Sequence, residues 1–177
     1  ATEDAGMYLV KWFGLTYDAC TWEAAADIAP EPIEKFRARE AAVASRMLKP
    51  PPAAVTMDVR SVGALPEGIL PSDRTLRDYQ LDGVRWLRHN YVLGRSVILG
   101  DEMGLGKTAQ SVVMLQCVRS VHRAHGPLLI VVPLSTLPHW VRELAEWTTL
   151  DAVVFYGNKD ARSVIQKHEF IRQIALP

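Results

Sequence analysis

Cysteine, net charge and long apolar runs are what this sequence has least of. Its 177 residues contain two cysteines, Cys20 and Cys117, which are too few for a disulfide scaffold or a zinc site. Twenty Lys and Arg residues balance twenty Asp and Glu residues, so composition does not indicate a polyanion-binding tail. The longest apolar runs, such as 128–134, are far shorter than the ~20 residues of a membrane span, and no signal peptide opens the chain. We therefore expect a soluble intracellular chain with no membrane partner.

Proline divides the sequence into two parts. Five prolines fall between residues 50 and 71. They interrupt any helix and favour an extended linker. We expect a first module at 1–49, a proline-rich linker at 50–74 and a second module at 75–177.

The first module has the pattern of a short β-meander closed by a helix. Apolar residues alternate along 7–13, as they do in a half-buried strand, and 21–23 can return beside it. Pro32 suits the first turn of a helix because its missing N–H costs nothing there. One apolar stripe then follows at helical spacing: Ile33, Phe36, Val43 and Met47.

Strands and helices alternate in the second module. Thr75 and Asp78 fit a capping box that opens a helix. The pattern predicts strands at 96–99, 128–132 and 152–156. It predicts further helices at 107–122, from the Ser135–Thr136 pair to Trp147, and at 160–174. This alternation is typical of an α/β fold, with helices flanking a parallel sheet.

A glycine-rich segment, residues 101–108, lies between a predicted strand and a predicted helix. Gly104 and Gly106 let the backbone approach a triphosphate and point amide N–H groups at it. Lys107 would neutralise charge on the β- and γ-phosphates, and the Thr108 hydroxyl would bind Mg²⁺. The strict phosphate-loop pattern has glycine at its first position, where this sequence has aspartate. The segment predicts a nucleotide site with Mg²⁺ in which Lys107 is the candidate catalytic residue.

Four segments of the second module can be compared with known families. They are 76–87, 101–108, 131–137 with Trp140 and Glu143, and 156–157 followed by Arg162. In this order they resemble the Swi/Snf-type ATPases of helicase superfamily two. The resemblance implies the first part of a RecA-like lobe, an α/β fold with a phosphate loop and a parallel sheet. In that family two such lobes clamp ATP and move along duplex DNA.

The resemblance also implies roles for individual residues. Gln80 would contact the adenine edge, and Arg77 would support the same pocket. Ser135 and Thr136, at a helix N-terminus, would contact a DNA phosphate, although capping alone would also explain a serine there. The implied nucleotide-binding set is Arg77, Gln80, Asp101, Glu102, Met103, Gly104, Leu105, Gly106, Lys107 and Thr108.

The first module, with residues 8–15, 21–23 and a closing helix, resembles the second half of a chromodomain. A chromodomain just ahead of this ATPase type is the arrangement of the chromodomain-helicase-DNA-binding family. The resemblance implies a nuclear protein whose partners are DNA, nucleosomes and histone tails. Trp12 would occupy one position of a methyl-lysine cage, but Leu15 stands where binders usually have an aromatic residue. We therefore interpret Trp12 and Trp22, and also Trp86 and Trp140, as core residues.

Several parts that this family uses for hydrolysis do not occur in the sequence. There is no Asp-Glu pair followed by Ala-His, and no second lobe with its arginines. An arginine finger alone is worth ~10³–10⁵ in rate. We expect a fragment of an ATP-dependent remodeller that slides nucleosomes, with little hydrolysis by the fragment itself. Two alternatives remain open: a chromatin reader with a vestigial ATPase lobe, and an ordinary phosphate-loop kinase or GTPase.

Overall fold

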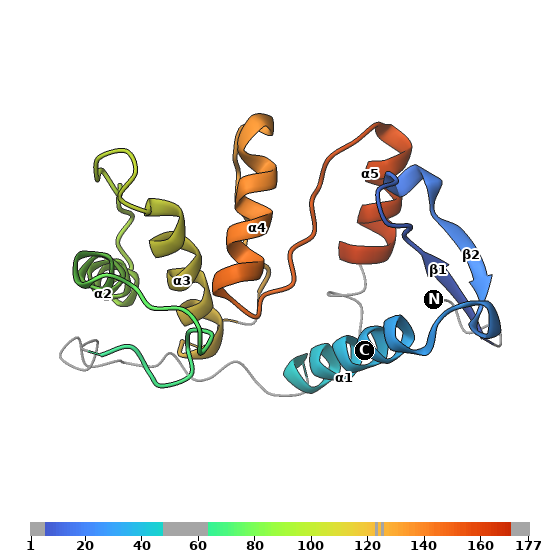
Figure 1. Cartoon of the computed structure of the whole chain (residues 1–177), viewed down its shortest axis with the longest axis horizontal. Helices are drawn as coiled ribbons and strands as arrows, with labels where there is room; N and C mark the ends of the chain where they lie inside the picture. The colour runs from blue at the N-terminus through green and yellow to red at the C-terminus, as the bar shows by residue number, and fades with distance from the viewer. Residues whose placement is uncertain (1–5, 48–63, 123, 125, 171–177) are drawn as a thin grey trace. The chain divides into compact units, whose positions relative to one another are not determined.

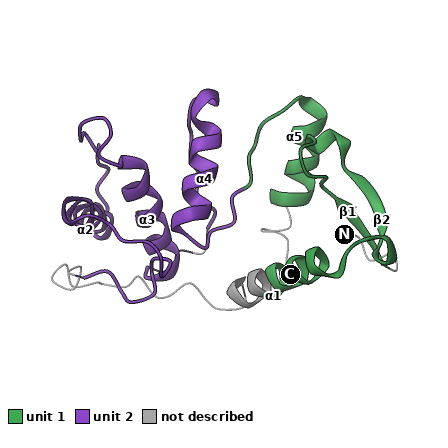
Figure 2. Cartoon of the chain, viewed as in Figure 1, with its two compact units in different colours: residues 1–50, 153–177 green, residues 51–152 purple. Residues whose placement is uncertain are grey.

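The computed structural model describes residues 6–47, 64–122, 124 and 126–170. The chain forms two compact units (Figure 2): unit 1 comprises Ala1–Pro50 and Val153–Pro177, and unit 2 comprises Pro51–Ala152. Much of the expected linker, the end of the last expected helix and the side chains of Val43 and Met47 lie outside what is described. Among the described helices, none is long and apolar enough to cross a membrane.

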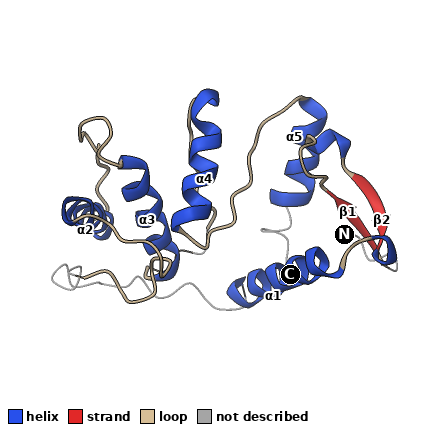
Figure 3. Ribbon diagram, viewed as in Figure 1, coloured by secondary structure: helices blue, strands red, loops and turns tan. Residues whose placement is uncertain are grey.

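Unit 1 contains a two-stranded antiparallel sheet (Figure 3). Strand β1 (Met7–Val10) pairs with β2 (Thr21–Ala24), and Leu9 lies opposite Trp22. The 3₁₀ helices η1 (Tyr17–Ala19) and η2 (Ala25–Asp27) precede and follow β2. The predicted strand through residue 13 is too long, because the chain turns after β1 and leaves Phe13 fully exposed.

Helix α1 (Pro30–Met47) follows the sheet and confirms the helix that was predicted to begin near Pro32. Phe36 of its apolar stripe contacts β1, where the rings of Tyr8 and Phe36 meet edge-on with centroids 5.8 Å apart. The Arg37 guanidinium donates a hydrogen bond of 2.9 Å to the Tyr8 hydroxyl. Sheet and helix therefore contact each other through both apolar and polar groups.

Helix α5 (Lys159–Ile165) and the π-helical turn η5 (Gln166–Phe170) also belong to unit 1. The side chain of Asn158 caps α5 by accepting a 2.8 Å hydrogen bond from the Ala161 amide. Ala161 and Ile165, one turn apart, are fully buried. The sequence pattern predicted this helix as part of the second module, because a helical stripe indicates a buried face but not the element that covers it.

Unit 2 is built around helix α3 (Lys107–Ser120), which lies between α2 (Asp78–Val92) and α4 (Leu137–Trp147) (Figure 1). The short 3₁₀ turn η4 (Leu134–Thr136) leads into α4. Most of α3 is buried, as its apolar sequence predicted. A buried cluster unites α2, α3 and the segment before them: Ile69, Val84, Val113 and Cys117.

The strands predicted at 96–99, 128–132 and 152–156 are not strands in the structure. In the described residues, the β1–β2 pair is the only sheet, so the parallel sheet is not observed. Segment 128–132 pairs with no strand among the described residues, and its alternate side chains Leu129 and Val131 are 87% and 85% exposed. An apolar run forms a strand only where a second segment pairs with it.

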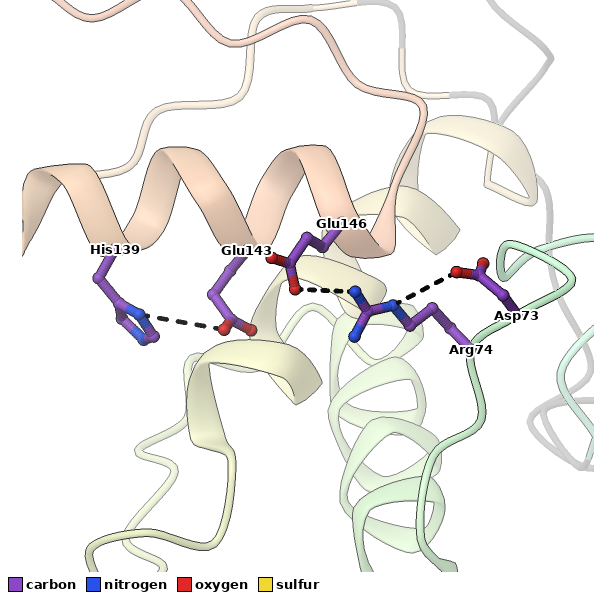
Figure 4. Close-up of polar contacts among 5 residues, drawn as sticks. All are labelled: Asp73, Arg74, His139, Glu143 and Glu146. Carbon is purple, nitrogen blue, oxygen red and sulfur yellow. Dashed lines mark hydrogen bonds and ion pairs between the residues drawn. The ribbon is translucent and has the colours of Figure 1, made fainter.

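Arg74 ties the segment before α2 to the end of α4 (Figure 4). Its Nη2 lies 3.0 Å from Oε2 of Glu146, and its Nε lies 3.9 Å from Oδ2 of Asp73. The guanidinium also lies 5.6 Å from the centroid of the Trp147 ring. This contact holds together two segments of unit 2 that are far apart in sequence.

Candidate nucleotide-binding site

The loop that leads into α3 has the backbone conformation that its glycines allow. Gly104 and Gly106 have φ angles of +85° and +75°, in the left-handed region that side chains rarely adopt. Gly106 is the residue immediately before the first helical residue, Lys107. The first amides of a helix have no intrahelical acceptor, so the start of α3 presents free N–H groups and the positive end of its dipole beside this loop.

The Lys107 ammonium is held inside the loop. Its Nζ donates hydrogen bonds to the backbone carbonyls of Asp101 and Glu102, at 2.7 and 2.8 Å. Carbonyls orient an ammonium without neutralising it, so the positive charge stays available to an anion. The cation and the helix start therefore lie together, an arrangement that suits a bound anion.

Gln80 joins the start of α2 to the same loop. Its Nε2 donates to the Leu105 carbonyl at 3.2 Å, and its Oε1 accepts from the Arg77 amide at 3.0 Å. A Cβ at Gly106 would overlap this amide nitrogen. The capping box predicted from Thr75 is wrong, because α2 begins at Asp78 with Arg77 before it, and Gln80 supplies the reaching-back contact.

Gln110, which no sequence motif indicated, contacts the loop from within α3. It is fully buried, and its Nε2 donates to Oδ2 of Asp101 at 3.0 Å. The available signal was a polar residue three positions after Lys107 on an otherwise apolar helix face. That signal is weak, since polar residues occur on many helices.

The remaining loop residues leave room for a ligand. Met103 and Leu105 are exposed, and Thr108 is half-buried in the first turn of α3. At Gly104, no described atom lies within 4 Å of the place that a Cβ would take. Amides, an ammonium, a hydroxyl and open space are what a phosphate group with Mg²⁺ needs, so the residues present fit the predicted ligand.

Ser135 and Thr136 lie in η4, at the entrance to α4. Thr136 occupies the position before the helix, but its hydroxyl donates backward to the Pro133 carbonyl at 2.9 Å. The Thr136 side chain therefore does not cap α4, and Ser135 is exposed. Their contact with a DNA phosphate remains a prediction.

The tryptophans are less buried than predicted. Trp12, Trp22 and Trp86 are 43%, 42% and 44% exposed, so their interpretation as core residues is wrong. The Trp12 indole donates a 2.8 Å hydrogen bond to the Thr21 hydroxyl, which keeps it at the surface of the sheet. An indole N–H needs a partner, and an exposed hydroxyl supplied one here.

Unit 1 has a cavity of about 230 Å³ of its own, but Trp12 does not line it. Its aromatic lining is provided by Tyr8, Tyr17 and Phe36. Burial, together with the Glu169 carboxylate, raises the pKa of Tyr17 to about 12. The cavity thus holds the neutral Tyr17 phenol beside the Glu169 carboxylate. Trp12, the residue at the cage position, lies outside it.

Two family models match the chain. The SNF2-related domain model matches residues 79–175, which is more than half of the chain, and this range includes the loop at 101–108. The Chromo (CHRromatin Organisation MOdifier) domain model matches residues 1–39, which include β1 and β2. The order of the two matches is the order of the two predicted modules.

Individual relatives match along nearly the whole chain. Protein CHROMATIN REMODELING 5 from Arabidopsis thaliana is 40% identical over 171 residues, which cover 94% of this chain and 10% of that protein. Chromodomain-helicase-DNA-binding protein 7 from Homo sapiens is 40% identical over 176 residues, 96% of this chain and 6% of that protein. Chromodomain-helicase-DNA-binding protein 6 from Rattus norvegicus is 35% identical over 169 residues, with the same two shares. The chain spans at most a tenth of these relatives' length. It belongs to the SNF2-related family, as a segment of the chromodomain-helicase-DNA-binding type.

Proposed function

We propose that residues 101–108 bind ATP with Mg²⁺. The observation that carries this proposal is the Lys107 ammonium, held by two loop carbonyls at the start of a buried helix. Gly104 and Gly106 give the loop left-handed turns, a conformation in which successive backbone amides can face an anion. No side chain of the loop supplies a competing anion to the ammonium among the described hydrogen bonds.

Each predicted residue has a separate task in this proposal. The amides that begin α3 and the Lys107 ammonium would bind the β- and γ-phosphates. The Thr108 hydroxyl would hold Mg²⁺, and Gln80 with Arg77 would lie beside the adenine. When bound, ATP supplies the phosphoanhydride bond whose hydrolysis can drive movement.

The longer protein, we propose, is a nuclear ATP-dependent DNA translocase that slides nucleosomes. Its relatives' names state chromatin remodelling, helicase and DNA binding, which supports this reading. We propose a partial chromodomain at 1–49, a linker at 50–74 and the first part of a RecA-like lobe at 75–177. Ser135 and Thr136 would contact DNA, and Trp12 would contact a histone tail.

The 177 residues alone are expected to bind nucleotide but to hydrolyse it very slowly. Phosphoryl transfer depends on charge placed around the γ-phosphate, and an arginine finger is worth ~10³–10⁵ in rate. Among the described residues, side chains that donate hydrogen bonds to residues 101–106 include those of Gln80, Lys107 and Gln110, which bind loop atoms and supply no second cation. Steady turnover by the isolated chain would contradict this expectation.

Titration of the 177-residue chain with MgATP in a calorimeter tests the site. Lys107→Ala should weaken MgATP binding by about 10- to 100-fold, the value of one hydrogen bond to a charged group. Lys159→Ala is the matched control, because Lys159 also begins a helix but lies in unit 1. Unchanged affinity in Lys107→Ala would refute the proposal, and tighter binding of GTP than ATP would favour the GTPase alternative.

A further inference from the structure

Asp101 is held at two points from α3. The Gln110 side-chain amide donates to its carboxylate at 3.0 Å, and the Lys107 ammonium donates to its backbone carbonyl at 2.7 Å. Asp101 itself is exposed, whereas Gln110 is fully buried. The rigid partner in this contact is therefore Gln110, and the loop residue is the one that is positioned.

The far side of the Gln110 amide lies against α2. A Cβ at Gly83 would overlap both Oε1 and Cδ of Gln110. Gly83 lies inside α2, where glycine is a poor helix former and no left-handed turn requires it. The close approach of Gln110 therefore explains why glycine stands there.

The Gln110 Oε1 atom is buried and has no hydrogen-bond partner in the described part of the chain. An unsatisfied buried oxygen lowers stability, so packing alone would favour an apolar residue of the same length. What the glutamine provides that an apolar residue cannot is the hydrogen bond to Asp101.

We propose that Gln110 is a positioning residue for the phosphate loop. It fixes the Asp101 carboxylate, and with it the carbonyl that orients the Lys107 ammonium, while Gly83 leaves the room that its amide needs. This inference rests on the proposed function of the loop as a nucleotide site. It also gives a role to the aspartate at the first loop position, because a glycine there would offer Gln110 no acceptor.

Gln116 provides a matched control on the same helix. It is also buried, and its Oε1 likewise has no partner within the described residues. Its Nε2 donates to Thr149 at 3.1 Å and to Ser120 at 3.3 Å, neither of which belongs to the loop. Replacing either glutamine by methionine keeps its length and removes one unsatisfied oxygen.

The experiment compares Gln110→Met and Gln116→Met in the 177-residue chain. Gln110→Met should weaken MgATP binding about tenfold, the loss of one hydrogen bond to a charged group, while its thermal midpoint without nucleotide does not fall. Gln116→Met should leave the affinity within about twofold.

Asp101→Asn should largely retain binding, because its amide oxygen can still accept from Gln110. Asp101→Ala should match Gln110→Met, and the two changes together should cost no more than either alone.

Hydrogen exchange without nucleotide separates this inference from the proposed function. The amides of residues 101–106 should exchange faster in Gln110→Met than in the unmodified chain or Gln116→Met. If the unmodified chain fails to bind MgATP, the proposed function fails, and the exchange result alone decides whether Gln110 holds the loop. Wild-type affinity with wild-type exchange in Gln110→Met, or additive losses in the double variant, would overturn the inference.

Discussion

At position 106, the backbone and a neighbouring side chain both require glycine. The φ angle of +75° costs an L-residue about 1–2 kcal/mol, and a Cβ would overlap the Gln80 amide. We expect Gly106→Ala to lower the free energy of unfolding by about 2 kcal/mol or more and to weaken MgATP binding at least tenfold. Urea denaturation and calorimetric titration measure the two effects.

Gly94→Ala is the control for this substitution. Gly94 has a similar φ angle of +66°, but no described atom lies within 4 Å of its would-be Cβ. It should therefore show only the backbone cost of about 1–2 kcal/mol and no loss of MgATP affinity. Equal losses in the two variants would mean that the contact with Gln80 has no energetic role.

His122 should make unit 2 less stable in mild acid. Its ring packs on Tyr91 with centroids 5.0 Å apart, and its Nε2 is buried without a partner among the described residues. Burial, and then the Arg88 charge, lower the pKa of His122 below its usual 6.5. The unfolded chain therefore binds a proton before the folded chain does, and stability falls as the pH drops below about 6.5 toward the folded pKa.

Replacing the imidazole tests that pH dependence. In His122→Leu, the difference in unfolding free energy between about pH 7.5 and 5.5 should be smaller than in the unmodified chain, because this proton uptake is gone. Urea denaturation at the two pH values gives the comparison. An identical pH dependence in both chains would exclude His122 as its source.

At the scale of elements, Arg74 should stabilise unit 2 by joining the segment before α2 to α4. Its pair with Glu146 is partly exposed and worth up to about 1 kcal/mol, and its stacking on Trp147 adds about 0.5–1 kcal/mol. Arg74→Met should cost about 1–2 kcal/mol in urea denaturation. Glu146→Gln should cost about half, since it leaves the stacking intact, and added salt should shrink its effect. Equal costs would show that the stacking on Trp147 contributes nothing.

Local signals predicted the helices, while non-local contacts decided the rest. Helix α3 begins at Lys107, where the glycine-rich loop and the apolar sequence placed it. The strand predicted at 128–132 is not observed, because a strand exists only with a paired neighbour and Leu129 faces solvent instead. The sequence could not predict the contact of Gln110 with Gly83 either, since this contact depends on how closely α2 and α3 approach each other.

At the scale of the whole molecule, unit 1 brings together residues from opposite ends of the chain. Asn158 donates to the Asp18 carboxylate at 2.9 Å. Glu169 accepts from the Tyr17 hydroxyl and pairs with Arg39, both at 3.3 Å. Within unit 1, the chromodomain-type sheet is therefore packed with α5 and η5, which follow the phosphate loop in sequence. We expect the sheet and these helices to fold and unfold together.

Glu169→Gln tests this long-range contact through Tyr17. Burial and then Glu169 raise the pKa of Tyr17 to about 12, so its contribution to stability is complete below about pH 10 and is lost as the pH rises toward 12. Removing the carboxylate charge should lower the pKa of Tyr17 only part of the way, because burial remains.

Absorbance titration of tyrosinate measures this pKa, with Tyr17→Phe identifying the signal of Tyr17 among the five tyrosines. MgATP affinity should not change, since the loop belongs to unit 2. A Tyr17 titration unaffected by Glu169→Gln would show that the two ends of the chain do not meet through this contact.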